Sequence, residues 1–305
     1  MKSLVSASTA GGHRQSRALP LGGAGRGLEA GSSLGAGRGL LSVIIPTYQP
    51  GAYIWECIDS LYRQTLDRSD FEVIIVLNGL EEPFLQQLQH GVATRYEGLN
   101  CEVLYTEEKG VSNARNKGIE ACRGDYVCFI DDDDWVSDTY LTTLLQQAAE
   151  DIVVVSNVTD YDEANDRLQN DYLTKAFNTL GAGQHVSLFR GRSFLSSSCC
   201  KIIPRKMIGT RRFNPRFAIG EDALFMAAIS NRMSEIVLSA PDAVYYRRLR
   251  PLSASRKKRT RGQILCNSLK LCGSYIRLGL SDILHYNHLL ISSRIAAVLM
   301  WVVKG

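Results

Sequence analysis

Four consecutive carboxylates, residues 131–134, directly follow an apolar segment. Residues 126–130 are aromatic, β-branched or cysteine and come after a turn residue, Gly124, so they are predicted to form a buried strand. Like charges about 4 Å apart repel by roughly 4 kcal/mol near a protein surface, so a folded site of this kind favours a bound cation. An acidic surface turn before a capped helix is the simpler alternative. Ligands bind at the ends of strands in open α/β sheets, and this position favours a binding site.

Charge is distributed unevenly along the 305 residues. Residues 1–40 carry five basic residues and one acid, and residues 245–305 carry twelve basic residues and one acid. The net charge of +4 therefore leaves about −11 on the middle of the chain. A body this acidic excludes a nucleic-acid surface, whereas the basic tail suits phosphate or an anionic membrane face. The 45% hydrophobic content allows one large core, with or without a small appendage.

The N-terminal residues and the cysteines bear on the order of the chain and on its location in the cell. Residues 1–40 hold ten of the 26 glycines and lack aliphatic periodicity, so they are predicted to be disordered. They contain no phosphate-binding glycine motif and no apolar stretch typical of a secretion signal. The eight cysteines lack metal-binding spacing, and several occupy apolar positions, so reduced core cysteines of a cytoplasmic protein are expected.

Strand and helix patterns alternate from Leu41 onward. Strands are predicted at 41–48, stopped by Pro46, and at 71–77 and 101–105, with helices at 53–66, 83–90 and 111–122. This alternation predicts an α/β fold with a mostly parallel sheet and right-handed crossovers. Because the carboxyl ends of parallel strands share one edge, Thr47, Asn78, Arg115 and Asp131 are expected to converge.

The second half of the chain has weaker patterns. We expect a helix at 140–149, a strand at 152–156, a hairpin or loop at 159–170 and a helix at 222–230, and we leave 199–208 unassigned. Short strands are expected at 236–238 and 243–246, and two amphipathic helices from Gln263. The apolar run 295–303 is too short to span a bilayer. It favours a core or interface helix, and the basic residues upstream leave a peripheral membrane contact open.

Three segments together resemble the inverting glycosyltransferases of family 2, which have the GT-A fold. They are SVIIPTY at 42–48, GVSNARNKGIEACRGDYVCFIDDDDW at 110–135 and IGEDALF at 219–225. The resemblance implies a Rossmann-like GT-A domain at 41–256, with a nucleotide-binding half at 41–135 and an acceptor half at 136–256. Residues 1–40 would then be a low-complexity N-terminus and residues 257–305 a C-terminal helical extension.

The resemblance implies transfer of a hexose from a nucleotide diphosphate sugar, usually a UDP-sugar, to an acceptor hydroxyl of a glycan or lipid-linked glycan. Mn²⁺ or Mg²⁺ would neutralise the leaving diphosphate. Asp131 and Asp133 match the family's DxD motif, which assigns Asp131 to the nucleotide sugar and Asp133 to the metal, with Asp132 and Asp134 equally able chemically. Asp222 is the expected general base, and Glu221 is expected to orient the acceptor or its loop.

Further residues are assigned to the nucleotide sugar by the same resemblance. They are Pro46, Thr47, Tyr48, Asn78, Ser112, Arg115, Asn116, Asp131 and Asp132. Asn78 departs from the acid that the family usually has here, although an amide oxygen can still bind a uracil imide. Arg115 suits bidentate contact with a diphosphate, or it can balance the acidic run instead. Weaker candidates for the acceptor or diphosphate are Lys201, Trp135, Arg247 and Arg250.

Two alternatives stay open on the sequence alone. The basic run that includes Arg247, Arg248, Arg250, Ser253 and Arg256 can form a mobile lid over the diphosphate, although a solvated basic face is favoured. The DxD after an apolar strand also describes a haloacid-dehalogenase-like phosphohydrolase, but Trp135 is unfavourable in such a site. We expect a cytoplasmic protein, with a peripheral membrane contact through its basic C-terminal helices and with the oligomeric state undetermined.

Overall fold

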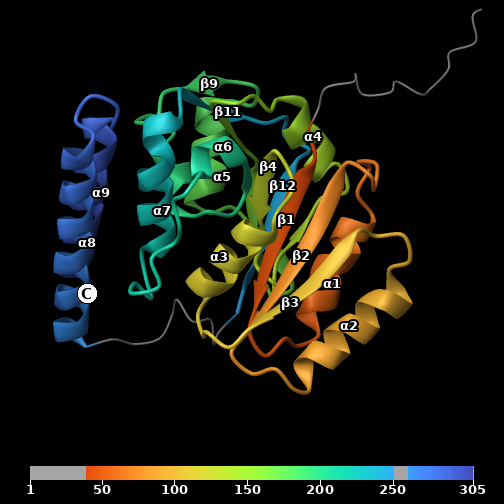
Figure 1. The fold of residues 1–305 in the computed structure, drawn as a ribbon. Coiled ribbons are helices and arrows are strands. Elements are labelled where there is room, and N and C mark those ends of the chain that lie inside the picture. The colour runs from red at the N-terminus through yellow and green to blue at the C-terminus, as the bar shows by residue number, and fades with distance from the viewer. Residues whose placement is uncertain (1–38, 251–259, 305) are drawn as a thin grey trace, which may run out of the picture. The chain divides into compact units, whose positions relative to one another are not determined.

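The computed structural model describes residues 39–250 and 260–304 (Figure 1). Of residues 1–40, which were expected to be disordered, only Gly39 and Leu40 are described, and Ser253 and Arg256 also lie outside the described residues. The described chain contains two β-sheets and a series of helices, and the fold class is α/β as predicted.

The larger sheet has eight strands in the order β3-β2-β1-β4-β10-β6-β11-β9. The strands are β1 (Leu41–Thr47), β2 (Phe71–Asn78), β3 (Cys101–Thr106), β4 (Tyr126–Phe129), β6 (Ile152–Val155), β9 (His185–Val186), β10 (Lys201–Pro204) and β11 (Glu235–Leu238). Strands β3, β2, β1 and β4 run parallel, which confirms the prediction for the first half of the chain. The unassigned segment supplies β10, which runs antiparallel between β4 and β6.

Strand β1 continues past the point where the sequence predicted a stop. Pro46 lies within β1, opposite Val76 of β2, and the strand ends at Thr47. The pairing of β1 with β4 extends only to Ile44, so the missing N–H of Pro46 falls where the β4 side no longer forms a ladder. Thr47 is thereby carried to the edge of the sheet beside the acidic run.

A second sheet of four strands begins directly after the acidic run. Its order is β5 (Trp135–Val136), β12 (Val244–Leu249), β7 (Asn157–Asp162) and β8 (Arg167–Gln169). The antiparallel pair β7 and β8 confirms the hairpin predicted at 159–170. Strand β12 pairs with both β5 and β7, so a segment more than a hundred residues downstream lies next to the carboxylates.

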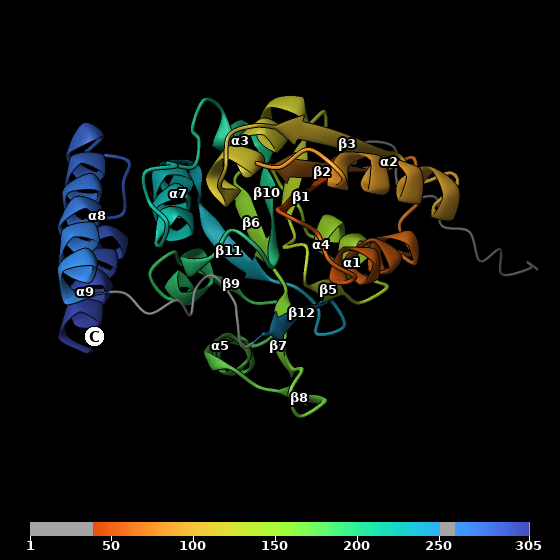
Figure 2. The same cartoon turned by 90° about the horizontal axis from the view of Figure 1, so that it is seen from below.

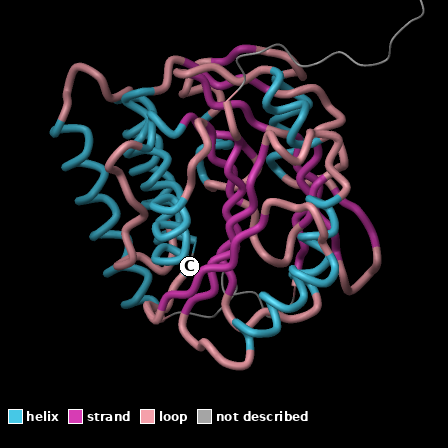
Figure 3. The backbone as a smooth tube through the Cα atoms, turned by 45° about the vertical axis from the view of Figure 1, so that its right-hand side comes forward, coloured by secondary structure: helices cyan, strands magenta, loops and turns pink. Residues whose placement is uncertain are grey.

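Helices cover both faces of the larger sheet. They are α1 (Tyr53–Tyr62), α2 (Phe84–Arg95), α3 (Val111–Ala121), α4 (Tyr140–Gln146), α5 (Tyr172–Leu180), α6 (Arg205–Ile208) and α7 (Glu221–Ile229), with short 3₁₀ turns at Arg192–Ser196 and Ser230–Arg232. Figure 2 shows α3 on one face and α1 and α4 on the other, and Figure 3 shows helices flanking the central strands. Helix α3 approaches β1 closely, since a Cβ on Gly118 would lie 2.4 Å from Ile44 Cγ2. The close approach brings Arg115 of α3 to the sheet edge.

The last two helices, α8 (Arg261–Ser281) and α9 (His288–Lys304), lie side by side and pack against α7 (Figures 1 and 2). Their contact forms a second apolar cluster, separate from the main core, that contains Ala227 of α7, Leu271 and Tyr275 of α8 and Ile291 of α9. Within the described residues, neither these helices nor any other is both long and apolar enough to cross a bilayer.

A buried carboxylate joins three segments at the far end of the parallel strands. Glu72 is 2% exposed and accepts hydrogen bonds from Ser42 Oγ and from the backbone N–H of Arg123, both at 2.7 Å. The Arg123 guanidinium pairs with it at 2.6 Å. Burial alone would raise the pKa of Glu72, but these hydrogen bonds and the arginine charge lower it below its ordinary value.

We expect Glu72→Gln to lower the free energy of unfolding by about 1–3 kcal/mol at pH 7, because a charged hydrogen-bond acceptor is lost. A lowered pKa in the folded state stabilises the protein above the unfolded pKa of about 4.3, and the contribution is lost as pH falls through the folded pKa. Urea unfolding of both proteins from pH 7 down to about pH 3.5 measures this. A difference that stays constant toward acid would contradict the role of the charge.

Candidate functional site

Each carboxylate of the acidic run has a different partner. Asp131 pairs with Arg115 Nη2 at 2.8 Å, and Asp132 accepts a hydrogen bond of 2.5 Å from Thr47 Oγ1. Asp133 forms an ion pair with Arg250, and Asp134 accepts a hydrogen bond of 2.7 Å from the hydroxyl of Tyr245. The resemblance assigned Asp131 to the nucleotide sugar and Asp133 to the metal and left Asp132 and Asp134 equally able chemically, and the structure gives the four acids different neighbours.

Asp134 holds the two sheets together. Its side chain is buried, and besides Tyr245 it accepts a 2.8 Å hydrogen bond from the backbone N–H of Arg248. Burial, followed by repulsion from Asp133 and Asp131, raises the pKa of this carboxyl well above its usual range. Both contacts are to β12, so Asp134 anchors that strand to the end of β4.

We expect Asp134→Asn to act on stability, because a buried acceptor of the Tyr245 hydroxyl is replaced by an NH₂ group, and that hydroxyl already accepts from the Asp131 N–H. The expected loss in the free energy of unfolding is about 1–3 kcal/mol. Asp133→Asn is the matched variant, since Asp133 lies one residue earlier and faces Arg250. Urea unfolding together with Mn²⁺-dependent donor binding separates the two. Wild-type stability with lost metal dependence in Asp134→Asn would contradict the anchoring role.

Arg115 connects the acidic run to the start of α7. Its Nη2 lies 2.8 Å from Asp131 Oδ1, and its Nη1 lies 2.6 Å from Asp222 Oδ1. The arginine is 3% exposed, and its guanidinium lies over the Phe213 ring at 5.4 Å. Asp131 and Asp222, 91 residues apart in the chain, therefore face one guanidinium and share one site. This pairing agrees with the second role considered for Arg115, in which it balances the charge of the acidic run.

The first turn of α7 presents two acids next to each other. Gly220, in the left-handed conformation at φ 85°, precedes the helix, and Glu221 and Asp222 occupy its first turn, where the helix dipole favours negative charge. Ser198 also donates a hydrogen bond to Asp222 Oδ1 at 3.3 Å. Burial, with repulsion from Asp222, raises the pKa of Glu221 to about 7.

Asn78 is engaged by the backbone at the ends of the first two strands. Its amide nitrogen donates to Thr47 O at 2.7 Å, and its oxygen accepts from the Gly110 N–H at 2.9 Å. The side chain therefore fastens β1 and β2 to the start of α3. Tyr48 is 46% exposed and lies against the backbone of Gly79, so its ring remains accessible beside this junction.

Several other predicted residues have structural partners. Asn116 exchanges two hydrogen bonds with the backbone of Phe213, at 2.8 and 2.9 Å, and Ser112 is buried in α3. Lys201 is 1% exposed and its Nζ donates to the carbonyls of Ser197, at 2.7 Å, and Cys199. These contacts shape the loop that faces Arg115, and the described hydrogen bonds of the Lys201 ammonium are to backbone carbonyls.

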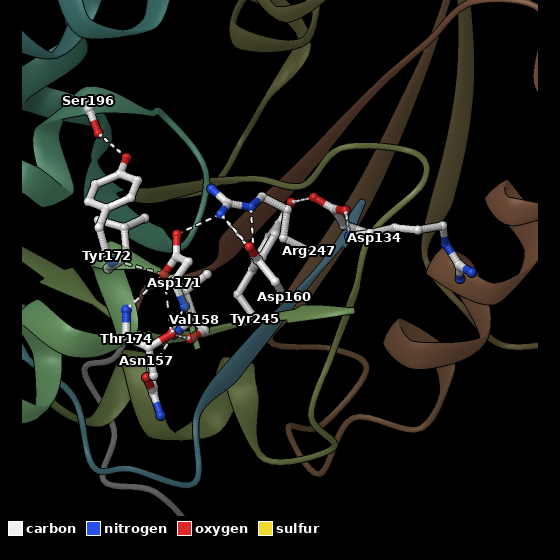
Figure 4. A network of polar contacts seen from close by, with 12 residues as sticks. Asp134, Asn157, Val158, Asp160, Asp171, Tyr172, Thr174, Ser196, Tyr245 and Arg247 are labelled. Carbon is white, nitrogen blue, oxygen red and sulfur yellow. Dashed lines mark hydrogen bonds and ion pairs between the residues drawn. The ribbon is translucent and has the colours of Figure 1, made fainter. Parts of the chain in front are cut away.

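The arginines of β12 are ion-paired rather than solvated, so the interpretation of this run as a solvated basic face is wrong for them. Arg247 contacts Asp160 at 2.7 Å and Asp171 at 2.6 Å, and Figure 4 shows it between these two carboxylates. Asp171 in turn caps α5 through the N–H groups of residues 173 and 174. Arg247 thus joins β7 of the second sheet to the start of α5.

Arg248 lies in an aromatic and acidic enclosure beside the acidic run. Its guanidinium lies 4.6 Å from the Tyr53 ring and 4.8 Å from the Trp135 ring, and it pairs with Glu56. Its Nε donates to the carbonyl of Asp133 at 3.0 Å. Trp135 also stacks on Tyr246 with ring centroids 5.3 Å apart. The sequence did not identify Tyr53, Glu56 and Tyr245 as neighbours of the acidic run, because they belong to no motif. Their place beside it depends on the pairing of β12 with β5, which the sequence did not predict.

The comparison with protein families decides the family. The sequence model described as "Glycosyl transferase family 2" matches residues 42–210, more than half of the chain. The chain belongs to glycosyltransferase family 2. The matched range contains the acidic run and Arg115, and Asp222 follows it.

Curated relatives include two bacterial glycosyltransferases. The putative glycosyltransferase EpsH of Bacillus subtilis is 28% identical over 179 residues, which are 57% of this chain and 49% of EpsH. The amylovoran biosynthesis glycosyltransferase AmsB of Erwinia amylovora is 31% identical over 194 residues, 59% of this chain and 60% of AmsB. The chain spans about half the length of the first of these relatives.

Solved structures share the fold. Residues 1–349 of S. aureus TarS in complex with UDP-GlcNAc align with a TM-score of 0.63 at 21% identity, over 85% of this chain and 71% of that one. The mannosyltransferase PcManGT of Pyrobaculum calidifontis, in complex with GDP-Man and Mn²⁺, aligns with a TM-score of 0.54 at 16% identity, over 88% and 76% of the two chains. At this identity the likeness establishes the GT-A fold of the family 2 chain.

The oxygen donors of this family 2 chain suit a divalent ion that arrives with a diphosphate. No three His, Cys, Asp or Glu side chains of residues 39–250 and 260–304 form a preformed metal cluster. Asp131, Asp132 and Asp133 are partly exposed, and of these Asp131 and Asp133 each face a guanidinium, that of Arg115 or Arg250. Mg²⁺ and similar ions are commonly held by one or two carboxylates plus substrate phosphates, so this donor set fits.

Proposed function

We propose that the protein is an inverting hexosyltransferase that moves a sugar from a UDP-sugar to a hydroxyl of a glycan or lipid-linked glycan. The observation that carries the proposal is the Arg115 bridge, which puts the DxD acid Asp131 and the base candidate Asp222 on one guanidinium. Support for the donor comes from the fold shared with TarS, whose structure contains UDP-GlcNAc. The polysaccharide acceptor is suggested by relatives such as AmsB.

In the proposed reaction, the acceptor oxygen forms a bond to the anomeric carbon while the bond from that carbon to the diphosphate breaks. Asp222 takes the proton from the acceptor hydroxyl, and Glu221, beside it, orients the acceptor. Asp131 and Asp133 would hold Mn²⁺ or Mg²⁺, which neutralises charge on the leaving diphosphate when bound. Tyr48 and Thr47 would border the nucleotide base, and Arg115 would hold Asp131 and Asp222 in position before donor arrives.

The contacts of Lys201 do not favour the phosphohydrolase alternative. Such a site needs a lysine facing the DxD carboxylates, and Lys201, which lies in the neighbouring strand, is buried with its ammonium on the carbonyls of Ser197 and Cys199. The family match also covers the acidic run.

A thermal-shift panel of UDP-, GDP- and dTDP-sugars with and without Mn²⁺ tests the proposal. A donor at a hundred times its dissociation constant adds about 2.7 kcal/mol to the free energy of unfolding, so the true donor is expected to raise the melting temperature. Release of free UDP from that donor then shows chemistry. No stabilisation by any nucleotide sugar, combined with hydrolysis of a simple phosphate ester, would overturn the proposal.

A further inference from the structure

Exposed apolar side chains are concentrated on the two C-terminal helices. Among the described residues, ten of the fifteen exposed large hydrophobic side chains lie between 265 and 303, although this segment is a small part of the chain. We call these ten the hairpin stripe: Leu265, Leu269, Ile276, Leu280, Ile283, Leu284, Leu289, Leu299, Met300 and Val303. Contiguous exposed apolar surface on a soluble chain marks an interaction site.

Helix α8 has two different apolar faces. Leu265, Leu269, Ile276 and Leu280 are spaced by four, seven and four residues, which places them within an arc of about 60° on a helix of 3.6 residues per turn. They are 49–65% exposed. Leu271 and Tyr275 lie on another face, where they are buried in the cluster with α7 and α9. The packing within the described chain thus uses one face of α8 and leaves the other open.

Helix α9 also has exposed apolar side chains on one side and buried ones on another. Leu289, Leu299, Met300 and Val303 are exposed, while Leu290 and Ile291 on the opposite side are buried. The single arginine within residues 288–303, Arg294, is 8% exposed and donates to the carbonyl of Arg192. Residues 288–303 therefore turn Arg294 inward and these apolar side chains outward, the reverse of a helix that faces only water.

The charges at the border of the hairpin stripe are positive. Lys270 and Arg277 are exposed on α8, seven residues apart and so on one side of the helix, and Arg261 is exposed at its start. Asp282 is the one acidic residue in the sequence 260–304, and it bonds His285 at 2.6 Å between the two helices. An apolar stripe bordered by lysine and arginine suits an anionic lipid surface.

We propose that the hairpin stripe docks the protein on an anionic lipid bilayer, with α8 and α9 lying in the plane of the interface. Neither helix is suited to cross the bilayer, in agreement with the hydropathy of the described helices. A second copy of the chain fits less well. A two-fold contact through this stripe would bring Lys270 and Arg277 toward the same two positive residues of the other copy, and like charges repel. The proposal does not depend on the transferase activity.

Flotation of the full chain with vesicles tests the proposal. Phosphatidylcholine vesicles are compared with vesicles that also contain phosphatidylglycerol, at low and at physiological salt. Binding is expected to the anionic vesicles and to weaken with salt. The triple variant Leu265→Gln/Leu269→Gln/Leu280→Gln is expected to bind at least about tenfold more weakly. The matched control Leu80→Gln/Leu168→Gln/Tyr172→Gln changes three exposed apolar residues elsewhere and is expected to bind as the wild type does.

A charge variant keeps the test independent of folding. Lys270→Gln/Arg277→Gln alters two exposed side chains and is expected to bind anionic vesicles about 25-fold more weakly, or about fivefold per charge. Circular dichroism monitors the helix content of every variant. Failure to bind anionic vesicles at low salt overturns the proposal, and so does a leucine variant that floats like the wild type. A wild-type dimer in light scattering that the leucine variant abolishes, without vesicle binding, assigns the stripe to a second copy instead.

Discussion

Asp222→Asn is expected to slow sugar transfer by about 10²–10⁴-fold, because a positioned general base contributes a rate factor of that order. The amide keeps the size of the side chain and its hydrogen bond from Ser198, so donor binding is expected to remain within about threefold of the wild type. The measurement is the rate of UDP release at saturating donor, together with the donor dissociation constant from thermal shift.

Glu221→Gln is the matched comparison, since Glu221 precedes Asp222 in the same turn and makes no ion pair with Arg115 among the described contacts. Its expected loss in rate is less than about tenfold, as suits an orienting residue. If Glu221→Gln were the more damaging of the two, the base would be Glu221 and the proposed assignment would be wrong.

Arg115→Met is expected to lower the free energy of unfolding by about 2–4 kcal/mol. Removal of one partner from a buried ion pair leaves an uncompensated charge. The side chains of Asp131 and Asp222 are 41% and 20% exposed, and solvent therefore limits the loss of stability. We also expect sugar transfer to fall by at least about a hundredfold, because Asp131 and Asp222 lose the group that fixes their positions. Urea unfolding and UDP release measure the two effects.

A double-mutant cycle separates the bridge from general packing. In Arg115→Met/Asp222→Asn the loss of stability is expected to be smaller than the sum of the single losses by about 0.5–3 kcal/mol, because the variants share one ion pair. Arg95→Met is the surface control, since Arg95 pairs with Asp59 at 3.6 Å with both side chains more than 40% exposed, and its expected cost is below about 1 kcal/mol. Strict additivity of the two losses would show that the bridge contributes nothing.

The sequence predicted the parts of the fold that depend on local pattern. Strands β1, β2 and β3 were predicted from apolar runs, and the segments between these runs have the apolar spacing of helices. The parallel pairing of the three strands is confirmed. The convergence of Thr47, Asn78, Arg115 and Asp131 followed from the shared edge of parallel strands, and the contacts among them agree with it.

The remainder depends on pairings that no local pattern carries. Strand β10 enters the sheet antiparallel between β4 and β6, and its four residues are too few to show a period. The contacts that distinguish Asp134 from the other three acids come from β12, which supplies Tyr245 and Arg248 from more than a hundred residues away. For the same reason a run of arginines typical of a solvated face turned out to be paired with carboxylates of strand β7 and helix α1.

Gly220 lies between the candidate site and the C-terminal helices. A Cβ at this position would lie 2.8 Å from Leu271 Cδ1 of α8, so the turn that delivers Asp222 fits directly beneath the C-terminal helices. A shift of α8 toward or away from α7 must therefore change the space available to that turn. If binding at the outer face of these helices shifts α8 against α7, the effect on Asp222 and the effect of an occupied Asp222 on the helices are equal in free energy.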